Sequence, residues 1–445
     1  MKDSGKLTRQ ERSWIYYDVG NSAFVLVVVT AIMPIFFKDV ASQGVAGAVS
    51  TANWGFANSL SSFILLGLAP ILGTFADYRD FKKKFLMFFI GTGVVFTLLL
   101  TLVQPGNWMM CLLLFIVAKL GFSGANIFYD AFLVDVTTRQ RMDRISSLGF
   151  GWGYIGSTVP FLMALALILL ERSQGGTLGV GLGAMRAAFV IVGIWWLMFS
   201  IPILRDVRQV HYIEPSERPV LTAVKRLMET FSEIRRYRQA FVFLMAYFFY
   251  IDGVDTIIVM ATSYGRDIGL GMDVLITAIL MVQVVAFPFV LIYGKLAERF
   301  GARKMLYAGI GVYILITLIG FYLPSFGSIQ LKMAMFWVMA FLVATSQGGI
   351  QALSRSYFGR LIPPERSAEF FGFYNIFGKF ATISGPLLMG IFSRVTGDSR
   401  YGLLSILLLF VIGGGMLKCV GTEGRADSPE DEAQKKIPPP EPYAS

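Results

Sequence analysis

The chain has 445 residues, of which 55% are hydrophobic and only 15% are charged, and its formal net charge at pH 7 is +10. A soluble protein with this balance would expose too much apolar surface, so the composition excludes a soluble protein. The excess of basic residues does not indicate a nucleic-acid partner, because no RNA- or DNA-binding motif is present and the charge lies between long apolar runs.

Twelve apolar runs follow one another along the chain, each long enough to cross a bilayer as a helix of about 17–25 residues. They cover about 14–37, 54–75, 85–103, 108–134, 146–170, 186–204, 239–262, 273–293, 305–323, 333–355, 369–391 and 402–419. The residues before the first run are polar and basic, and the run itself is too long for a cleavable signal peptide. The sequence therefore predicts an all-α integral membrane protein with twelve transmembrane helices.

The basic residues gather on one side of the predicted bundle. If the N-terminus lies inside, the inner segments hold 25 Lys and Arg, and the outer loops hold six. Segments rich in Lys and Arg stay in the cytoplasm, so both termini are expected there, beside the anionic lipids of the inner leaflet.

The chain divides into five predicted segments. Residues 1–13 form a cytoplasmic N-terminal segment, 14–204 a first six-helix half, 205–238 a cytoplasmic linker, 239–420 a second six-helix half, and 421–445 a tail that should be disordered. In the linker, apolar residues recur at helical spacing at Leu221, Val224, Leu227, Phe231 and Ile234. We expect an amphipathic helix there on the inner leaflet, acting as a passive tether, with regulation as the alternative.

A junction in the second half has a copy in the first. The segment Gly294-Lys-Leu-Ala-Glu298-Arg299-Phe-Gly301-Ala-Arg303-Lys304 has a worn counterpart 221 residues earlier, Gly73-Thr-Phe-Ala-Asp77-Tyr78-Arg79-Asp80-Phe-Lys82-Lys83-Lys84. In a membrane protein, such a repeat at half the chain length is typical of a transporter with two fused halves. We expect an inner gate with the intact second copy better defined, and ordinary surface pairing is the alternative. The gate residues are Asp77, Arg79, Glu298, Arg299 and Arg303.

Polar residues inside the predicted helices gather on helices 1, 4, 7, 10 and 11. In helix 4, steps of 4, 3 and 4 residues place Lys119, Ser123, Asn126 and Asp130 on one face. The other positions are Asp18 and Asn21 in helix 1, Asp252 and Asp255 in helix 7, Gln351 and Arg355 in helix 10, and Asn375 and Lys379 in helix 11. A charge at the bilayer centre costs about 2.5–3.5 kcal/mol, so these residues should line a substrate or proton path. Helices 3, 6, 9 and 12 would then face lipid.

Two lysines and two aspartates should lie near mid-membrane, namely Lys119, Lys379, Asp252 and Asp255. This balance suits a zwitterion whose carboxylate points toward Lys and whose ammonium points toward Asp. Alternatives are structural ion pairs among the four, or an Asp that carries a coupling proton. For Asp18, the alternative is a favourable position near the positive end of helix 1.

Asp130 and Arg355 occupy corresponding positions in the two halves, 225 residues apart, at the cytoplasmic rim of their helices. Because their charges are opposite, we expect them to pair across the halves when the inner side closes. Asp18 and Asp252, although equivalent in the repeat, fall at different distances from their outer loops. Either helix 1 extends outward beyond the bilayer or the two acids differ in depth.

Longer motifs carry a resemblance to a known family. The junction at Gly294 resembles the loop signature of the major facilitator superfamily, whereas the copy at Gly73 departs from it at Tyr78 and Asp80. Three segments are similar to the branch that contains the fungal autophagy-related vacuolar amino-acid effluxer and its bacterial relatives. They are Trp14-x-x-Tyr17-Asp18-x-x-Asn21-Ser22, Tyr250-x-Asp252-Gly253-Val254-Asp255-Thr256, and Ser356 to Lys379.

The resemblance covers essentially the whole chain and implies the major facilitator fold, with two pseudo-symmetric six-helix halves. It implies a secondary active or facilitative transporter that moves a small solute by rocker-switch alternating access, with amino-acid efflux and proton coupling as the specific hypotheses. The alternatives are a lysolipid or lipid-like substrate, or a membrane sensor or scaffold without transport. The expected location is the cytoplasmic membrane of a bacterium, and the expected functional unit is a monomer.

No enzyme, cofactor or metal site is expected. The sequence contains no metal-ligand cluster, nucleotide loop or nucleophile motif. Gly151-x-Gly153-x-x-Gly156 matches the sequence pattern of a dinucleotide-binding fingerprint. It is not interpreted as one, because it begins an apolar helix and no strand precedes it. It is better interpreted as a small-residue face for close helix packing.

Overall fold

The computed structural model describes residues 6–173, 181–214, 225, 229, 237–267 and 269–421. Within these ranges, twelve helices are long and apolar enough to cross a membrane, which confirms the predicted number. The predicted amphipathic helix of the linker and the predicted disordered tail fall almost entirely outside the described residues. In the linker helix only Lys225 and Glu229 are described, and they form an i,i+4 ion pair at 3.8 Å.

The first six spans are helical throughout. The first combines α1 (Arg9–Ala23), η1 (Phe24–Ile32), α2 (Met33–Phe36) and η2 (Phe37–Ala41). The next five are α3 (Gly47–Ala76), α4 (Phe81–Leu99) with η3 (Leu100–Leu102), α5 (Trp108–Ala131) with α6 (Leu133–Val136), α7 (Met142–Ser173) and α8 (Leu182–Asp206).

The second six spans begin at Arg238. They are α10 (Arg238–Asp267), α11 (Met272–Phe300), α12 (Ala302–Tyr322) with η4 (Leu323–Ser325), α13 (Ile329–Leu361), α14 (Ser367–Thr396), which follows η5 (Pro364–Arg366), and α15 (Ser399–Lys418). In apolar surroundings a helix satisfies its own backbone hydrogen bonds, which explains why every apolar run adopts this form.

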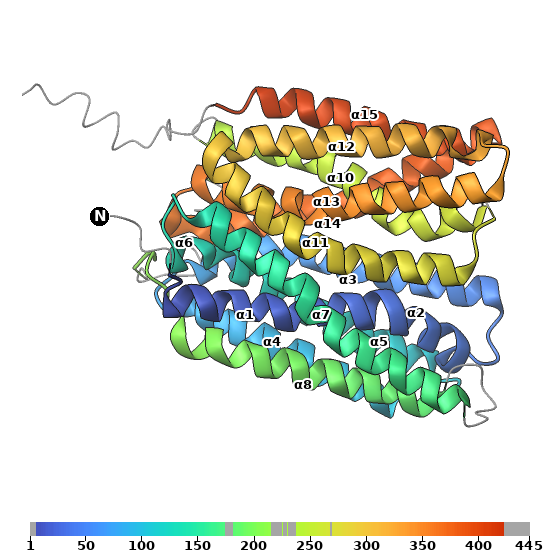
Figure 1. Ribbon diagram of the computed structural model, residues 1–445. Coiled ribbons are helices and arrows are strands. Elements are labelled where there is room, and N and C mark those ends of the chain that lie inside the picture. Colours follow the sequence, from blue (N-terminus) through green and yellow to red (C-terminus); the bar gives the residue numbers. More distant parts are fainter. Residues whose placement is uncertain are drawn as a thin grey trace, which may run out of the picture.

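The helices α1 to α8 lie beside α10 to α15 in one bundle (Figure 1). The two sets of helices meet through α7 against α11 and α13, and through α14 against α3 and α5. A path between the two sets is therefore bordered by helices from both.

The first span is longer than predicted and begins at Arg9. Thr8 fixes this start, because its side chain accepts a hydrogen bond from the Glu11 N–H at 3.1 Å and its own N–H donates to the Glu11 carboxylate at 2.8 Å. Asp18 consequently lies well beyond the first turn. The positive helix end therefore does not explain the position of this buried acid.

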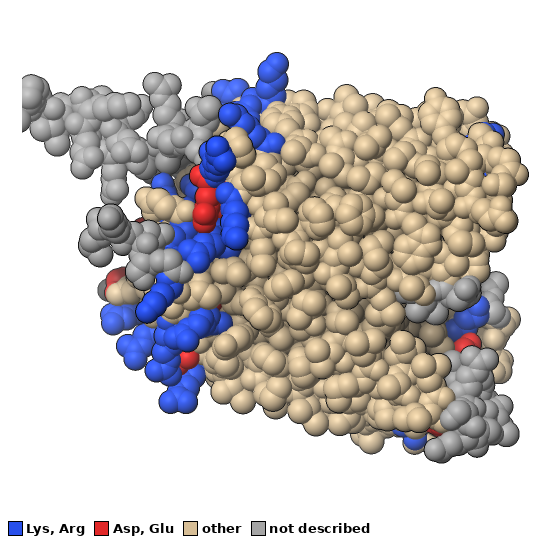
Figure 2. All heavy atoms as spheres, viewed as in Figure 1, with Lys and Arg blue, Asp and Glu red and all other residues tan. Residues whose placement is uncertain are grey.

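Lys and Arg side chains gather at one end of the bundle, as Figure 2 shows. We call it the basic end. It carries the loops at 77–80, 137–141 and 362–366, the start of α1 and the end of α15. Exposed basic residues there include Arg12, Lys84, Arg299 and Lys304. The opposite end is called the far end below.

The two copies of the junction share a positive φ but differ in backbone conformation. Gly301 joins α11 to α12 with a φ of 88° and a ψ of 140°, a conformation that suits glycine. Asp80 occupies the equivalent position before α4 and adopts a φ of 65° and a ψ of 0°, in the left-handed region that Asp visits more readily than most residues. Residues 77–80 separate α3 from α4, whereas Gly301 alone separates α11 from α12, so the worn copy forms a different turn.

Gly93 allows α4, α5 and α8 to meet closely. A methyl group added there would overlap with the Trp196 ring of α8 and would lie 3.3 Å from the Phe122 nitrogen of α5. We predict that Gly93→Leu lowers the melting temperature of the purified protein, because overpacking typically costs about 1–3 kcal/mol.

Gly91→Leu is the matched control, since an added methyl group there meets nothing within 4 Å. Thermal unfolding of both variants in the same detergent measures the difference. Equal melting temperatures would show that the contact at Gly93 does not constrain the bundle.

Candidate functional site

A central cavity of about 820 Å³ lies between the two sets of helices. Seven of the residues predicted to form a substrate or proton path line it, namely Asp18, Asn21, Asn126, Asp130, Gln351, Arg355 and Asn375. Most of its wall comes from the first, fourth, seventh and tenth spans, as expected. The ninth and twelfth spans, predicted to face lipid, each contribute one residue, Ile316 and Leu403.

The cavity has a charged floor and an apolar wall. The charged residues of the lining lie near the basic end. Toward the far end the wall is built from aliphatic and aromatic side chains such as Val259, Leu275, Val282, Phe336 and Met339. A solute in this space meets charge at one end and a mainly apolar surface beyond it, with polar side chains such as Asn58, Gln283 and Gln347 between the apolar ones.

Arg355 of α13 forms the centre of the floor. Its guanidinium donates to Asp130 of α5 at 3.2 Å and to Asp18 of α1 at 3.4 Å. It also donates to the hydroxyl of Ser146 on α7 at 2.9 Å and to the Ser146 carbonyl at 3.1 Å. The predicted pairing of Asp130 with Arg355 is confirmed, and Asp18 is a second partner. One cation of the second half is thus held by three spans of the first.

Aromatic rings enclose the same guanidinium. Its central carbon lies 4.6 Å from the ring centre of Trp14, 5.3 Å from that of Tyr129 and 4.3 Å from that of Phe150. Trp14 stacks on Tyr129 and donates its indole N–H to the Tyr129 carbonyl at 2.9 Å. The rings attract the cation through their faces and exclude water from around it, which strengthens its ion pairs.

Amide side chains extend the polar floor into the cavity. The Asn375 amide of α14 donates to Asp130 at 3.2 Å. The Asn21 amide donates to the Asn126 side chain at 2.7 Å, and the Tyr154 hydroxyl donates to Gln351 at 3.4 Å. These groups offer both donors and acceptors to a solute above the charged cluster.

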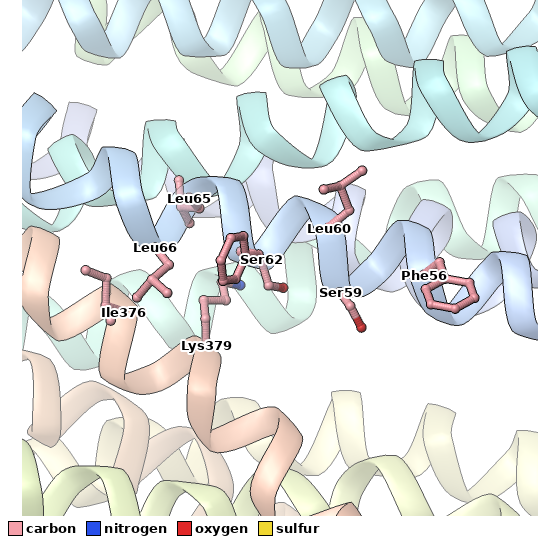
Figure 3. A pocket seen from close by; sticks show the side chains of 9 residues that line it. Phe56, Ser59, Leu60, Ser62, Leu65, Leu66, Ile376 and Lys379 are labelled. Atoms are coloured by element: carbon pink, nitrogen blue, oxygen red, sulfur yellow. The ribbon is translucent and has the colours of Figure 1, made fainter.

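The two predicted lysines lie outside the lining of the central cavity. Lys119 donates to the Asn58 side chain of α3 at 2.7 Å. Lys379 lines a smaller crevice between α3 and α14 (Figure 3). Lys379 interacts electrostatically with Asp255 and Asp130, and Lys119 interacts with Lys379.

Asp252 is a structural residue in this conformation. It is fully buried, and its carboxylate accepts hydrogen bonds from the Ser384 hydroxyl and, at 2.7 Å, from the Gly385 N–H of α14. Asp255 is half-buried and belongs to neither of the described linings. None of Lys119, Lys379, Asp252 and Asp255 lines the central cavity, although Asp255 interacts electrostatically with both Lys379 and Asp252. Their role as a zwitterion site stays a prediction. Counted from the start of its helix, Asp252 also lies deeper than Asp18.

The basic end is closed by the first copy of the junction. The Asp77 carboxylate accepts hydrogen bonds from the Ala368 and Glu369 N–H groups of α14, at 2.8 and 3.1 Å. These N–H groups belong to the first helical turn and have no partner within the helix, so a carboxylate there is strongly favoured. Gly73 permits the approach, because a methyl group at that position would overlap with the Ala368 carbonyl.

Two further polar contacts join the halves at the basic end. The Lys82 ammonium, fully buried, donates to Asp135 and to the Ser367 hydroxyl of α14, both at 2.8 Å. Arg360 of α13 pairs with Asp143 of α7 at 2.7 Å. None of Asp135, Asp143 and Arg360 was predicted as a site residue. The offset of 225 that relates Asp130 to Arg355 also relates Asp135 to Arg360, so extending the comparison would have found these two residues but not Asp143.

The expectation that the second copy forms the better-defined gate is wrong. Glu298 and Arg299 are exposed, and neither forms an ion pair with a described residue. The reason lies in the opposing helix. Gly294 meets Ser147, in the interior of α7, where the N–H groups are already bonded, whereas Gly73 meets the first turn of α14.

The two remaining gate candidates also differ from the prediction. Arg303 donates to the Val420 and Lys418 carbonyls at 2.9 and 2.8 Å and so caps α15 within its own half. Arg79 pairs with Glu214 at 3.5 Å, and both side chains are largely exposed. Neither residue joins the two halves through these contacts.

Comparisons with known proteins agree with this architecture. The family model described as vacuole effluxer Atg22 like matches residues 8–140 and 134–427. The uncharacterized MFS-type transporter YxiO of Bacillus subtilis is 49% identical over 95% of this chain and 97% of its own length. The autophagy-related protein 22-1 of Penicillium rubens is 23% identical over 85% of this chain and 78% of its own length.

The fold also has solved counterparts. The proton:xylose symporter XylE of the major facilitator superfamily, bound to 6-bromo-6-deoxy-D-glucose, aligns with a TM-score of 0.68 over 93% of this chain and 95% of its own. The sequence identity is 14%, so this likeness concerns the fold alone.

The helix cap at Asp77 leads to a prediction about closure of the basic end. We expect Asp77→Ala to shift the population toward a state open at that end, because hydrogen bonds to a charged group contribute about 1.5–3 kcal/mol each. Spin labels at Lys84→Cys and Glu365→Cys, in a background with Cys111→Ala and Cys419→Ala, report the distance between the halves.

Glu298→Ala is the matched control, because Glu298 is the equivalent residue of the second copy and is exposed. We expect the control to keep the distance distribution of the unsubstituted protein. The same distribution in the Asp77→Ala protein would show that the cap does not hold the halves together.

Proposed function

Because the chain belongs to the vacuole effluxer Atg22-like family and is a major facilitator transporter of a small solute, we propose that its solute is a zwitterion with an apolar side chain, of the amino-acid class. It is an integral membrane protein and not an enzyme. The observation that carries the proposal is the cavity itself, with the Asp18–Arg355–Asp130 cluster at its floor and aliphatic walls above.

The floor has an unbalanced charge that suits a solute ammonium. Two carboxylates, those of Asp18 and Asp130, face one guanidinium, so the cluster as a whole favours one additional positive charge. An ammonium group placed at the floor supplies it. Because the surroundings are apolar, the attraction is weakened far less than it would be in water.

The solute carboxylate and side chain have their own partners in the cavity. The amides of Asn21, Asn126 and Gln351 border the cluster and provide N–H donors for a carboxylate. The apolar wall toward the far end accommodates an aliphatic or aromatic side chain, at about 25 cal/mol per Å² of apolar surface removed from water. This arrangement supports neutral, apolar amino acids over acidic or basic ones.

Transport would proceed by alternating access. The described state is closed at the basic end and has its cavity directed toward the far end. The gathering of Lys and Arg supports a cytoplasmic position for the basic end and for both termini, in a bacterial inner membrane. The described state would then be outward-facing, and inward opening would require Arg355 to leave Asp18 and Asp130.

The separation of Arg355 from Asp18 and Asp130 suggests how proton movement is coupled to solute transport. Removing one partner of a buried ion pair costs about 3–5 kcal/mol when the remaining charge stays buried. A proton on Asp130, or the solute ammonium beside it, lowers this cost. We therefore include proton coupling through the floor cluster in the proposal.

Flux measurements on the purified protein in proteoliposomes test the solute. We predict uptake of radiolabelled leucine that Arg355→Gln reduces at least about tenfold, because two buried carboxylates lose their counter-charge. Arg355→Lys should retain part of the activity, since it keeps the charge and loses the forked geometry.

Lys304→Gln is the matched control for a lost basic residue, because Lys304 is exposed at the basic end. It should transport leucine like the unsubstituted protein. No flux of leucine, phenylalanine or any other neutral amino acid by well-folded protein would overturn the proposed solute class.

The same liposomes test proton coupling. We predict that an imposed pH gradient raises the leucine flux of the unsubstituted protein and has no effect on Asp130→Asn, which cannot exchange a proton at position 130. Asp39→Asn, at an exposed acid of η2, should respond like the unsubstituted protein. An unchanged response in Asp130→Asn would remove Asp130 from the coupling mechanism.

A further inference from the structure

A second opening lies between α3 and α14 and is separate from the lining of the central cavity. It has a volume of about 340 Å³ and is lined by one side of α3, from Phe56 to Leu66, and by Ile376 and Lys379 of α14. We call it the lateral crevice (Figure 3).

The lateral crevice opens toward the surroundings of the bundle. The two helices touch near the basic end, where Gly73 meets Ala368, and the crevice begins further along both helices. Phe56 and Phe63 are 73% and 71% exposed at its edge. Both belong to a membrane span, where exposed apolar rings are suited to contact with the hydrocarbon of the bilayer.

A basic residue lies at the inner end of this apolar opening. The Lys379 side chain extends from α14 toward Ser62 of α3 (Figure 3). Its ammonium lies 5.9 Å from the centre of the Phe122 ring, which lines the central cavity. Lys119 is the second cation within electrostatic reach. The carboxylates of Asp255 and Asp130 also interact with Lys379. The lateral crevice therefore joins an apolar opening to a lysine beside the central cavity.

The equivalent contact on the other side of the molecule is filled. There α7 packs against α11, and the rings of Trp152 and Phe287 meet at a centre-to-centre distance of 5.5 Å. By the offsets of 221 and 225, Phe287 corresponds to Leu66, and Tyr154 corresponds to Lys379. The lysine of the α3–α14 side thus has a tyrosine at its equivalent position on the α7–α11 side.

We propose that the lateral crevice binds a single-chain amphiphile with an anionic head group. The alkyl chain lies along Phe56, Leu60 and Phe63, and the head group lies against Lys379. A charged group inside a membrane usually marks a binding or transport path. Lys119 interacts with Lys379, so an anionic head group would add a counter-charge to that of the Asp255 and Asp130 carboxylates. The proposal is independent of the proposed amino-acid solute.

Photocrosslinking in nanodiscs of phosphatidylcholine tests this site on the full chain. A palmitate with a diazirine in its chain should label the α3 segment 56–66, as located by mass spectrometry of the peptides. We expect Lys379→Gln and Ser59→Trp to reduce this labelling about tenfold, equivalent to about 1.4 kcal/mol. Lys379→Arg should preserve it.

Val284→Trp is the matched control, because Val284 is exposed on α11 at the position equivalent to Phe63. Unlabelled palmitate or palmitoyl-lysophosphatidylglycerol should compete, and the better competitor identifies a fatty acid or a lysophospholipid as the source. Hexadecyltrimethylammonium, which is cationic, should not compete.

Three results would overturn the proposal. They are labelling of α3 in Lys379→Gln equal to that of the unsubstituted protein, equal labelling in Ser59→Trp and Val284→Trp, and competition by the cationic amphiphile as strong as by the anionic ones. The readout requires no transport, so an absence of leucine flux would leave it unaffected.

Discussion

The burial of Arg355 is the constraint on which the rest of the structure depends. This guanidinium is only 2% exposed and lies within a membrane-spanning bundle, where an uncompensated charge is costly. Compensation comes entirely from the opposite half, through Asp18, Asp130 and Ser146, with aromatic rings around them. If the two halves separate at the basic end, the charges of Arg355, Asp18 and Asp130 therefore lose their ion-pair partners. Closure of the bundle and chemistry of the cavity floor are properties of one cluster.

The remaining contacts at the basic end follow a different principle. Asp77 binds the unsatisfied N–H groups at the start of α14, and Lys82 is shared between Asp135 and Ser367 at the same helix start. These contacts join the junction between α3 and α4 of the first half to the start of α14 in the second half. They hold the closed state without filling the path. The cavity remains free for a solute while the end beneath it is sealed.

The sequence predicts the twelve spans and most of the cavity lining, because both depend on local properties, namely the length of apolar runs and helical spacing. It does not predict the role of Asp252, because that role depends on which residue of α14 lies opposite, and the Gly385 N–H was not identifiable from the pattern. The prediction that the second copy of the junction forms the better-defined gate was wrong for a similar reason. Glu298 matches the family signature better than Asp77 does, yet the signature contains no information about where the opposing helix begins.

One helix, α14, takes part in four of the features described above. Its first turn is capped by Asp77, Asn375 binds Asp130 at the floor, Lys379 lines the lateral crevice, and Gly385 binds Asp252 of α10. A rigid element with four attachments links their free energies. A ligand that stabilises the docked position of α14 also stabilises the sealed basic end. By thermodynamic reciprocity, the sealed basic end increases the affinity for that ligand by the same factor. A ligand in the lateral crevice and a solute in the central cavity would thus be coupled through a single helix.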